Sequence, residues 1–305
     1  MRVPLISWTS PSDPHRLPHG RFVSLRGRAA ASRFSFQREP SACLEKDWYA
    51  VELSLTTYLI LLPVIFLAGV VDAVCGGGGL LTIPAYLLTG FSAHVATGTN
   101  LAATICGGVA ALCRFARGGK VHWPAMVSAG PTAAVGALLG ARFNLFLPDR
   151  SLQIILLILL PVVAVTVFMK RELGLEDLMD TLSSRQIRRN SALIGLAVGA
   201  YNGFYGAGAG TFFIIAFTLF DRMDLVRASG STKFCSLCAV LVATLTYTLS
   251  GTVVWPMVLA GSVFSVAGNL LGSELALRNG AKVIRPMFIG VLALLFLRLC
   301  AGVFL

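Results

Sequence analysis

Two glycine-rich segments hold the residues whose types and spacing could do chemistry. Asp72 comes just before the first run of glycines, and Asn202 comes just before the second. Each glycine costs a helix about 1 kcal/mol relative to alanine, so we expect the backbone to unwind at both places. The residues of these runs that we predict to contact a solute are Gly76, Gly77, Gly78 and Gly79, then Gly206, Gly208, Gly210 and Thr211.

Anion binding is the chemistry that such a break offers. Apolar residues follow each glycine run and can start a new helix. The first N–H groups of a helix have no partner within it and lie at the positive end of its dipole, so they attract negative charge. The alternative interpretation is that the glycines only let helices cross closely.

Hydroxyl, amide and ammonium groups gather in a second pair of segments. These groups can cap a helix or contact a solute. The candidates are Thr97, Thr99 and Asn100 in the first segment, and Ser231, Thr232 and Lys233 in the second. Because Lys233 lies early in an apolar segment, its ammonium must reach the interface, pair, or face water. Snorkelling to the interface and attraction of an anion both stay open for this residue.

Asp72 ends an apolar run, where an ionised carboxylate is costly. It could carry a proton, accept hydrogen bonds from the loop backbone, or pair with Lys233. Its counterpart Asn202 is neutral, so one segment of the two can use a charge at this place.

Composition shows which solvent these segments need. Hydrophobic residues make up 56% of the chain and charged residues 13%, and the mean hydropathy is +0.78. Soluble domains carry about 25% charged residues, because water must solvate their surface. We therefore predict an all-α integral membrane protein. The net charge of +11 does not point to nucleic acid, because the basic residues form no stripe and lie between apolar runs, as in cytoplasmic loops.

Eight apolar segments are long enough to span a bilayer, which takes about 20 helical residues. They fall into a first unit at 51–169 and a second at 191–305, separated by a charged loop at 170–190. The predicted spans are Leu53–Val74, Val95–Phe115, Trp123–Leu147, Leu152–Met169, Ala192–Phe220, Val226–Leu249, Trp255–Leu277 and Ile284–Phe304, with Leu80–Leu88 as a shorter stretch.

The two units are predicted to be homologous repeats. An offset of 132 places Trp123-Pro124 on Trp255-Pro256, and an offset of 130 places Asp72 on Asn202. The loop at 117–120 is basic while its counterpart at 250–254 is uncharged, which favours opposite orientations of the repeats. That arrangement requires one glycine-broken segment to dip in and return. The expected fold is a polytopic bundle of two repeats with broken helices, and such duplication is common in transporters.

Residues 1–50 differ from the rest, being rich in Arg, Ser and Pro and lacking a signal-peptide core. A disordered basic tail, a targeting segment and a mis-assigned start are the three interpretations. Of the seven cysteines, Cys235 and Cys238 form a C-x-x-C motif within an apolar run. We predict small buried cysteines there and no disulfide framework.

Other function classes lack their motifs. The four histidines stand without a carboxylate at metal-site spacing, and no hydrolase or nucleotide-binding motif is present, so we predict no enzyme, no cofactor and no metal site. A cation or metal-ion permease is the alternative to an anion transporter, although it would need more acidic residues in the membrane. A homo-oligomer stays open.

At these residues the chain resembles the sulfite exporter TauE/SafE family of permeases, from Leu53 to Leu305. The resemblance rests on Asp72 with Gly76–Gly79 and Pro84, on Gly98–Asn100, on Phe115–Gly119 and on Tyr201–Gly208. It implies a secondary transporter of sulfite, a sulfonate or another organic anion in the plasma membrane of a bacterium. Apart from the resemblance, the position of Asp72 leaves proton coupling through its carboxylate open. Members often have a basic residue at the position of Leu101 and an Asp at the position of Asn202. Both charges are missing here.

Overall fold

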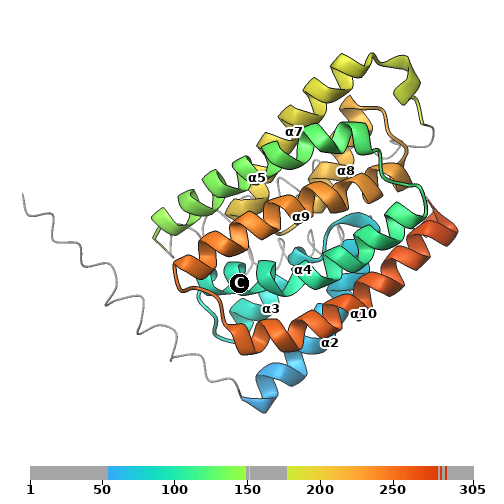
Figure 1. The fold of residues 1–305 in the computed structure, drawn as a ribbon. Coiled ribbons are helices and arrows are strands. Elements are labelled where there is room, and N and C mark those ends of the chain that lie inside the picture. Colours follow the sequence, from blue (N-terminus) through green and yellow to red (C-terminus); the bar gives the residue numbers. More distant parts are fainter. Residues whose placement is uncertain (1–53, 149–150, 152–176, 281, 284–285, 287–305) are drawn as a thin grey trace, which may run out of the picture. The chain divides into compact units, whose positions relative to one another are not determined.

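The computed structural model describes residues 54–148, 151, 177–280, 282–283 and 286. Within these ranges the chain folds into eight α-helices and one 3-10 turn (Figure 1). The predicted tail at 1–50 and the predicted span Leu152–Met169 lie outside the described residues. So does the predicted span Ile284–Phe304, apart from residue 286.

Helices of the first unit follow in the order long, short, long, long. They are α2 (Leu55–Cys75), α3 (Gly79–Leu88), α4 (Ala93–Arg117) and α5 (Trp123–Phe146). Polar caps start two of them, since Ser54 accepts a hydrogen bond from the Thr57 N–H in α2 and His122 accepts one from the Ala125 N–H in α5.

The second unit has the same order of helix lengths. It consists of α7 (Ser184–Phe204), α8 (Ala209–Phe220), α9 (Leu225–Leu249) and α10 (Trp255–Asn279). Helix α7 begins inside the segment predicted as a charged loop at 170–190, because Ser183 and Gln186 form a capping box there. Asp224 caps α9 by accepting from the N–H groups of Val226 and Arg227.

Five of the described helices, α2, α4, α5, α9 and α10, are long and apolar enough to cross a membrane. The predicted single span over Ala192–Phe220 is wrong. The chain breaks after Phe204, because Gly206 and Gly208 adopt left-handed φ angles of +79° and +75°, and α8 then starts in a new direction.

Both glycine-broken segments enter the bundle and turn back. The sequence analysis had required this of one segment only. Leu61 near the start of α2 and Tyr86 near the end of α3 belong to the same apolar cluster. In the second unit, the hydroxyl of Ser191 near the start of α7 donates to the carboxylate of Asp221 at the end of α8, at 2.5 Å. Each short helix therefore comes back to the end of the bundle from which its long partner started.

Small residues let the broken hairpins pack tightly against the long helices. Helix α5 lies against α7, and α10 lies against α2 (Figure 1). A side chain at Gly136 of α5 would meet the Leu196 carbonyl of α7, and one at Gly268 of α10 would meet the Phe66 carbonyl of α2. These glycines therefore let the backbones of the paired helices come close together.

Helices α4 and α9 cross at the centre and run in opposite directions. The N–H of His122, just after α4, donates to the Ser231 hydroxyl near the start of α9, at 3.1 Å. Conversely, the N–H of Val254, just after α9, donates to the Thr99 hydroxyl near the start of α4, at 3.0 Å. Each helix thus begins where the other ends.

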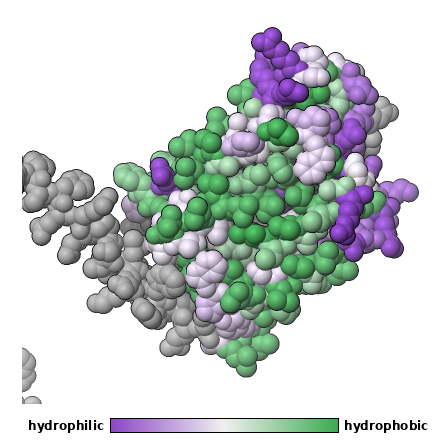
Figure 2. Space-filling view, in the orientation of Figure 1, coloured by the Kyte–Doolittle hydropathy of each residue, from purple (hydrophilic) through white to green (hydrophobic). Residues whose placement is uncertain are grey.

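The surface of the bundle matches a lipid environment. Figure 2 shows a broad apolar face over α4, α9 and α10, with hydrophilic residues gathered mainly at one end. Leu245 and Leu259 are among the large apolar side chains that stay exposed. Arg114, in the last turn of α4, pairs with Glu274 of α10. Water would not solvate so much apolar surface, whereas lipid does.

Candidate functional site between the broken helices

The break in the first unit is a single left-handed turn. Gly76 has a φ of +72°, and its N–H donates to the Asp72 carbonyl at 2.9 Å, which closes α2. Helix α3 then starts at Gly79, three residues on. Gly77 and Gly78 form the short link between the helices, and the Thr82 hydroxyl donates back to the Gly78 carbonyl at 3.4 Å.

The break in the second unit needs two left-handed glycines, Gly206 and Gly208. The hydroxyl of Tyr201 donates to the Ala207 carbonyl between them, at 2.7 Å, and so fixes the loop. Helix α8 begins directly afterwards at Ala209. As predicted, both glycine runs are helix breaks followed by a new helix.

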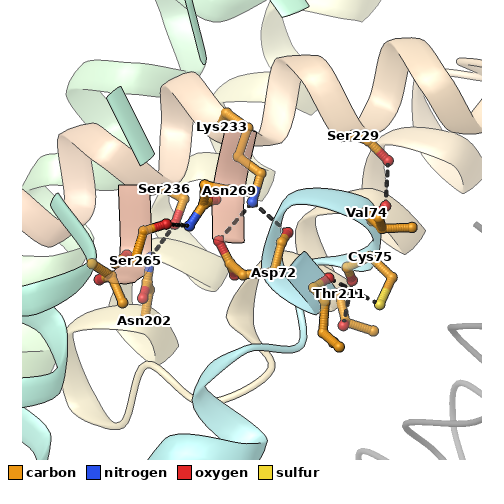
Figure 3. A network of polar contacts seen from close by, with 12 residues as sticks. Asp72, Val74, Cys75, Asn202, Thr211, Ser229, Lys233, Ser236, Ser265 and Asn269 are labelled. Carbon is orange, nitrogen blue, oxygen red and sulfur yellow. Dashed lines mark hydrogen bonds and ion pairs between the residues drawn. The ribbon is translucent and has the colours of Figure 1, made fainter. Parts of the chain in front are cut away.

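The two breaks meet at their tips. A side chain at Gly210 would lie 2.5 Å from the Gly76 Cα, so the two backbones touch. The Thr211 hydroxyl of α8 donates to the Cys75 carbonyl of α2 at 2.7 Å. Figure 3 shows this bond beside that from the Ser229 hydroxyl of α9 to the Val74 carbonyl, at 3.3 Å. The glycines Gly76 and Gly210 therefore serve close packing as well as the turn.

An ion pair joins the first break to α9. The Lys233 ammonium lies 2.7 Å from the Asp72 carboxylate and also donates to the Asp72 backbone carbonyl (Figure 3). The Lys233 side chain is 4% exposed and the Asp72 side chain 28% exposed. Among the three interpretations of Asp72, pairing with Lys233 is the one that the structure has, and Lys233 does not snorkel to the interface.

A polar cavity of about 40 Å³ lies beside this ion pair, between the two units. Its walls come from both glycine breaks and from the central helices α4 and α9. The lining residues are Asp72, Gly79, Asn100, Leu101, Thr104, Ile105, Gly108, Asn202, Gly206, Gly210, Lys233, Ser236, Leu237 and Val240. Gly79 and Gly210 lie in the first turns of α3 and α8, so the first turns of both helices form part of the cavity wall.

Seven of the predicted site residues share this cavity, and the others do not line it. The seven are Asp72, Gly79, Asn100, Asn202, Gly206, Gly210 and Lys233. Thr99 and Ser231 instead hold the connections after the opposite central helices. Thr97 and Thr232 are buried, and their hydroxyls have no hydrogen-bond partner in the described part of the chain.

Two polar residues of the cavity wall, Thr104 and Ser236, were missed from the sequence, and helix periodicity could have found them. Thr104 follows Asn100 by one turn on α4, and Ser236 follows Lys233 by nearly one turn on α9, so each lies on the same face as its predicted neighbour. Ser236 accepts a hydrogen bond from the Asn202 amide at 3.2 Å (Figure 3).

The cavity can offer ammonium, amide and hydroxyl groups to a solute. Its carboxylate is already paired with an ammonium. In the described part of the chain, no cluster of three or more His, Cys, Asp or Glu side chains could hold a metal ion. The described cysteines, Cys235 and Cys238 among them, form no disulfide with one another.

Comparison with known proteins identifies the family. The family model described as "Sulfite exporter TauE/SafE" matches residues 61–299. The chain belongs to the sulfite exporter TauE/SafE family. The match includes both glycine breaks, the ion pair and the cavity, and no solved structure matches the chain.

Several bacterial relatives cover most of the chain. The "Probable membrane transporter protein ORF9" of Sinorhizobium sp is 31% identical over 236 residues, which are 77% of this chain and 89% of that protein. The "Probable membrane transporter protein YfcA" of Escherichia coli K12 is 32% identical over 241 residues, 79% and 88% respectively. A "Probable membrane transporter protein" of Haemophilus influenzae is 28% identical over 247 residues, 78% and 92% respectively.

Membership of the TauE/SafE family makes this chain a multi-pass membrane protein of a transporter family and not an enzyme. The resemblance seen at Asp72, Gly76–Gly79 and Tyr201–Gly208 is thereby confirmed. The structure also shows where the two charges that family members often have, and this chain lacks, would lie. Leu101 and Asn202, the two departures, both line the cavity that Asp72 and Lys233 line.

Proposed function

We propose that this protein is a secondary transporter that moves a small anion, namely sulfite, a sulfonate or another organic anion, across the plasma membrane of a bacterium. The observation that carries the proposal is the cavity at the Asp72–Lys233 pair. A buried ammonium and the N-termini of α3 and α8 converge there, and all three favour negative charge.

The same observation disfavours the alternative of a cation or metal-ion permease. A cation site in a membrane protein is built from several carboxylates or from carbonyl rings. Of the described residues that line the cavity, Asp72 carries the negative charge and Lys233 the positive one. A cation would therefore meet a carboxylate that is already neutralised.

We further propose that the two units are inverted repeats that rock against each other around the cavity. The reciprocal hydrogen bonds of α4 and α9 support this. Thr99 and Ser231 differ by the offset of 132 found in the sequence, and so do their partners His122 and Val254. Such an exchange of equivalent contacts is what a two-fold axis in the membrane plane produces.

The cavity volume of about 40 Å³ supports an alternating-access cycle. Room for a few water molecules is too little for a hydrated anion. In the proposed cycle the units must part on one side to admit the anion and close before opening on the other. The basic connections around Arg117 and Arg222 gather at one end of the bundle, which we assign to the cytoplasm.

Transport by the purified protein in liposomes tests this proposal. Vesicles are loaded with sulfite, sulfate, thiosulfate or methanesulfonate, and loss of each anion is followed by ion chromatography against protein-free vesicles. We expect faster loss of at least one anion, and a weaker apparent affinity for it in Lys233→Ala. No flux of any of these anions, or flux of potassium or magnesium instead, would reject the anion proposal.

A further inference from the structure

The cavity is electrically neutral as it stands. Asp72 and Lys233 are the charged groups among the described lining residues, and their charges cancel. Among the described residues, the Cys75 thiol also lies within electrostatic reach of the pair. An anion that entered this cavity alone would leave an uncompensated negative charge inside the membrane, which is costly.

The Asp72 carboxylate is also bound to the Lys233 ammonium, which is the group that an anion would need. A lysine ammonium has three N–H donors. One points at the Asp72 carboxylate and another at the Asp72 backbone carbonyl. The carboxylate is thus a built-in competitor for the ammonium, held in place because it is part of the chain.

Protonation of Asp72 would remove both obstacles. A neutral carboxylic acid no longer holds the ammonium electrostatically, so the donor that faces it becomes available. The second bond, to the Asp72 backbone carbonyl, does not depend on this proton, so Lys233 stays beside the cavity. With Asp72 neutral, a monovalent anion on Lys233 restores the zero net charge.

We propose that Asp72 binds a proton each time the cavity takes up an anion, so that the protein moves a monovalent anion together with a proton. This inference rests on the anion transport proposed above. The proton goes to the Asp72 carboxylate, the anion replaces the carboxylate at the Lys233 ammonium, and both leave when the ion pair forms again. By linkage, each of the two ligands raises the affinity for the other.

The second unit explains why a single proton accompanies the anion. At the offsets of the repeats, Asn202 stands where the first unit has Asp72, and Leu101 stands where the second unit has Lys233. The Asn202 amide bonds to Ser236 and carries no charge. Among the described lining residues, one carboxylate can therefore exchange a proton in the cavity. A site with Asp in both units would have two such carboxylates.

Proton movement in liposomes tests the inference. Vesicles with an entrapped pH dye and a membrane potential clamped by potassium and valinomycin receive a gradient of methanesulfonate or isethionate, which stay monovalent at the pH used. Entry of the anion is measured in parallel. We expect internal acidification at about one proton per anion, and an anion flux that does not respond to the membrane potential, because the coupled pair carries no net charge.

Variants separate Asp72 from other carboxylates. In Asp72→Asn we expect anion entry without acidification, driven by the membrane potential, whereas Asp72→Glu should keep the coupling. Glu274→Gln removes a carboxylate that pairs with Arg114 outside the cavity, and we expect it to leave the proton-to-anion ratio unchanged.

The outcomes are distinguishable. Anion flux in the unmodified protein that follows the membrane potential and brings no protons would overturn the coupling while anion transport stands. No entry of either sulfonate would overturn the coupled transport of a monovalent anion, and no flux of any anion in the earlier liposome test as well would overturn both proposals. Should Asp72→Asn fail to fold, the response of the unmodified protein to the membrane potential still decides the question.

Discussion

Gly76 and Gly210 touch through their backbones, although they belong to different units of the bundle. Gly76 follows the end of α2, and Gly210 lies in the first turn of α8. Their contact therefore joins the turn after α2 to the start of α8. No residue with a side chain fits at this contact, which lies next to the ion pair and the cavity.

Gly76→Ala is therefore expected to destabilise the protein more than a glycine substitution with the same backbone strain. Gly76 and Gly119 have similar left-handed φ angles of +72° and +65°, but the space around Gly119 is open. The strain costs about 1–2 kcal/mol at either site, and overpacking adds about 1–3 kcal/mol at Gly76 alone. Thermal unfolding in detergent measures the difference, and equal losses for the two variants would contradict the backbone contact.

Replacing one partner of the Asp72–Lys233 ion pair should lower the stability of the protein more than replacing both. Lys233→Met leaves the Asp72 carboxylate beside the cavity without its cation, a cost of about 1–3 kcal/mol. The double variant with Asp72→Asn leaves no charge behind and is expected to recover part of that loss. Unfolding midpoints of the two single variants and the double variant give the coupling, and simple additivity would argue against the pair.

A second ion pair can be built at the equivalent place in the other half of the cavity. Asn202→Asp alone and Leu101→Lys alone each add an unpaired buried charge, so both should lower the unfolding midpoint. If the repeats are inverted, the two new charges face each other as Asp72 and Lys233 do, and the double variant should be more stable than either single one. A double variant less stable than both would contradict the proposed symmetry.

Asp221 should make stability depend on pH. It lies in the connection between α8 and α9, where burial raises its pKa to about 6 against the opposing hydrogen bond from Ser191. Its pKa in the unfolded chain is lower, at 3.8. The folded state therefore binds the proton more tightly, and the stability that this contributes is lost as the pH rises through about 6.

Asp221→Asn is expected to reduce this loss. Between about pH 5 and about pH 8, the unfolding midpoint of the variant should fall less than that of the unmodified protein, because no buried charge forms. Asp180→Asn, at an exposed position, serves as the control and should follow the unmodified protein. An equal fall in Asp221→Asn would show that Asp221 is not the group responsible.

The sequence by itself determined the class of protein, the helix breaks and the matching of the two units. These features are local or periodic. Glycine runs unwind a helix wherever they occur, apolar segments need lipid, and a constant offset between Trp-Pro pairs is visible without coordinates. For the same reason, Asp72 and Lys233 could be chosen as candidate site residues from their places in apolar segments.

Tertiary structure alone decided which of these residues meet. The ion pair joins positions 161 apart in the chain, and nothing local distinguishes pairing of Lys233 from snorkelling. The sequence required one glycine-broken segment to turn back but did not show that the segment after Phe204 does so, because hydropathy is the same whether an apolar segment crosses the membrane or turns back. Contacts such as Gly76 with Gly210 depend on how the hairpins pack in three dimensions, since close packing is a property of two surfaces and not of either segment.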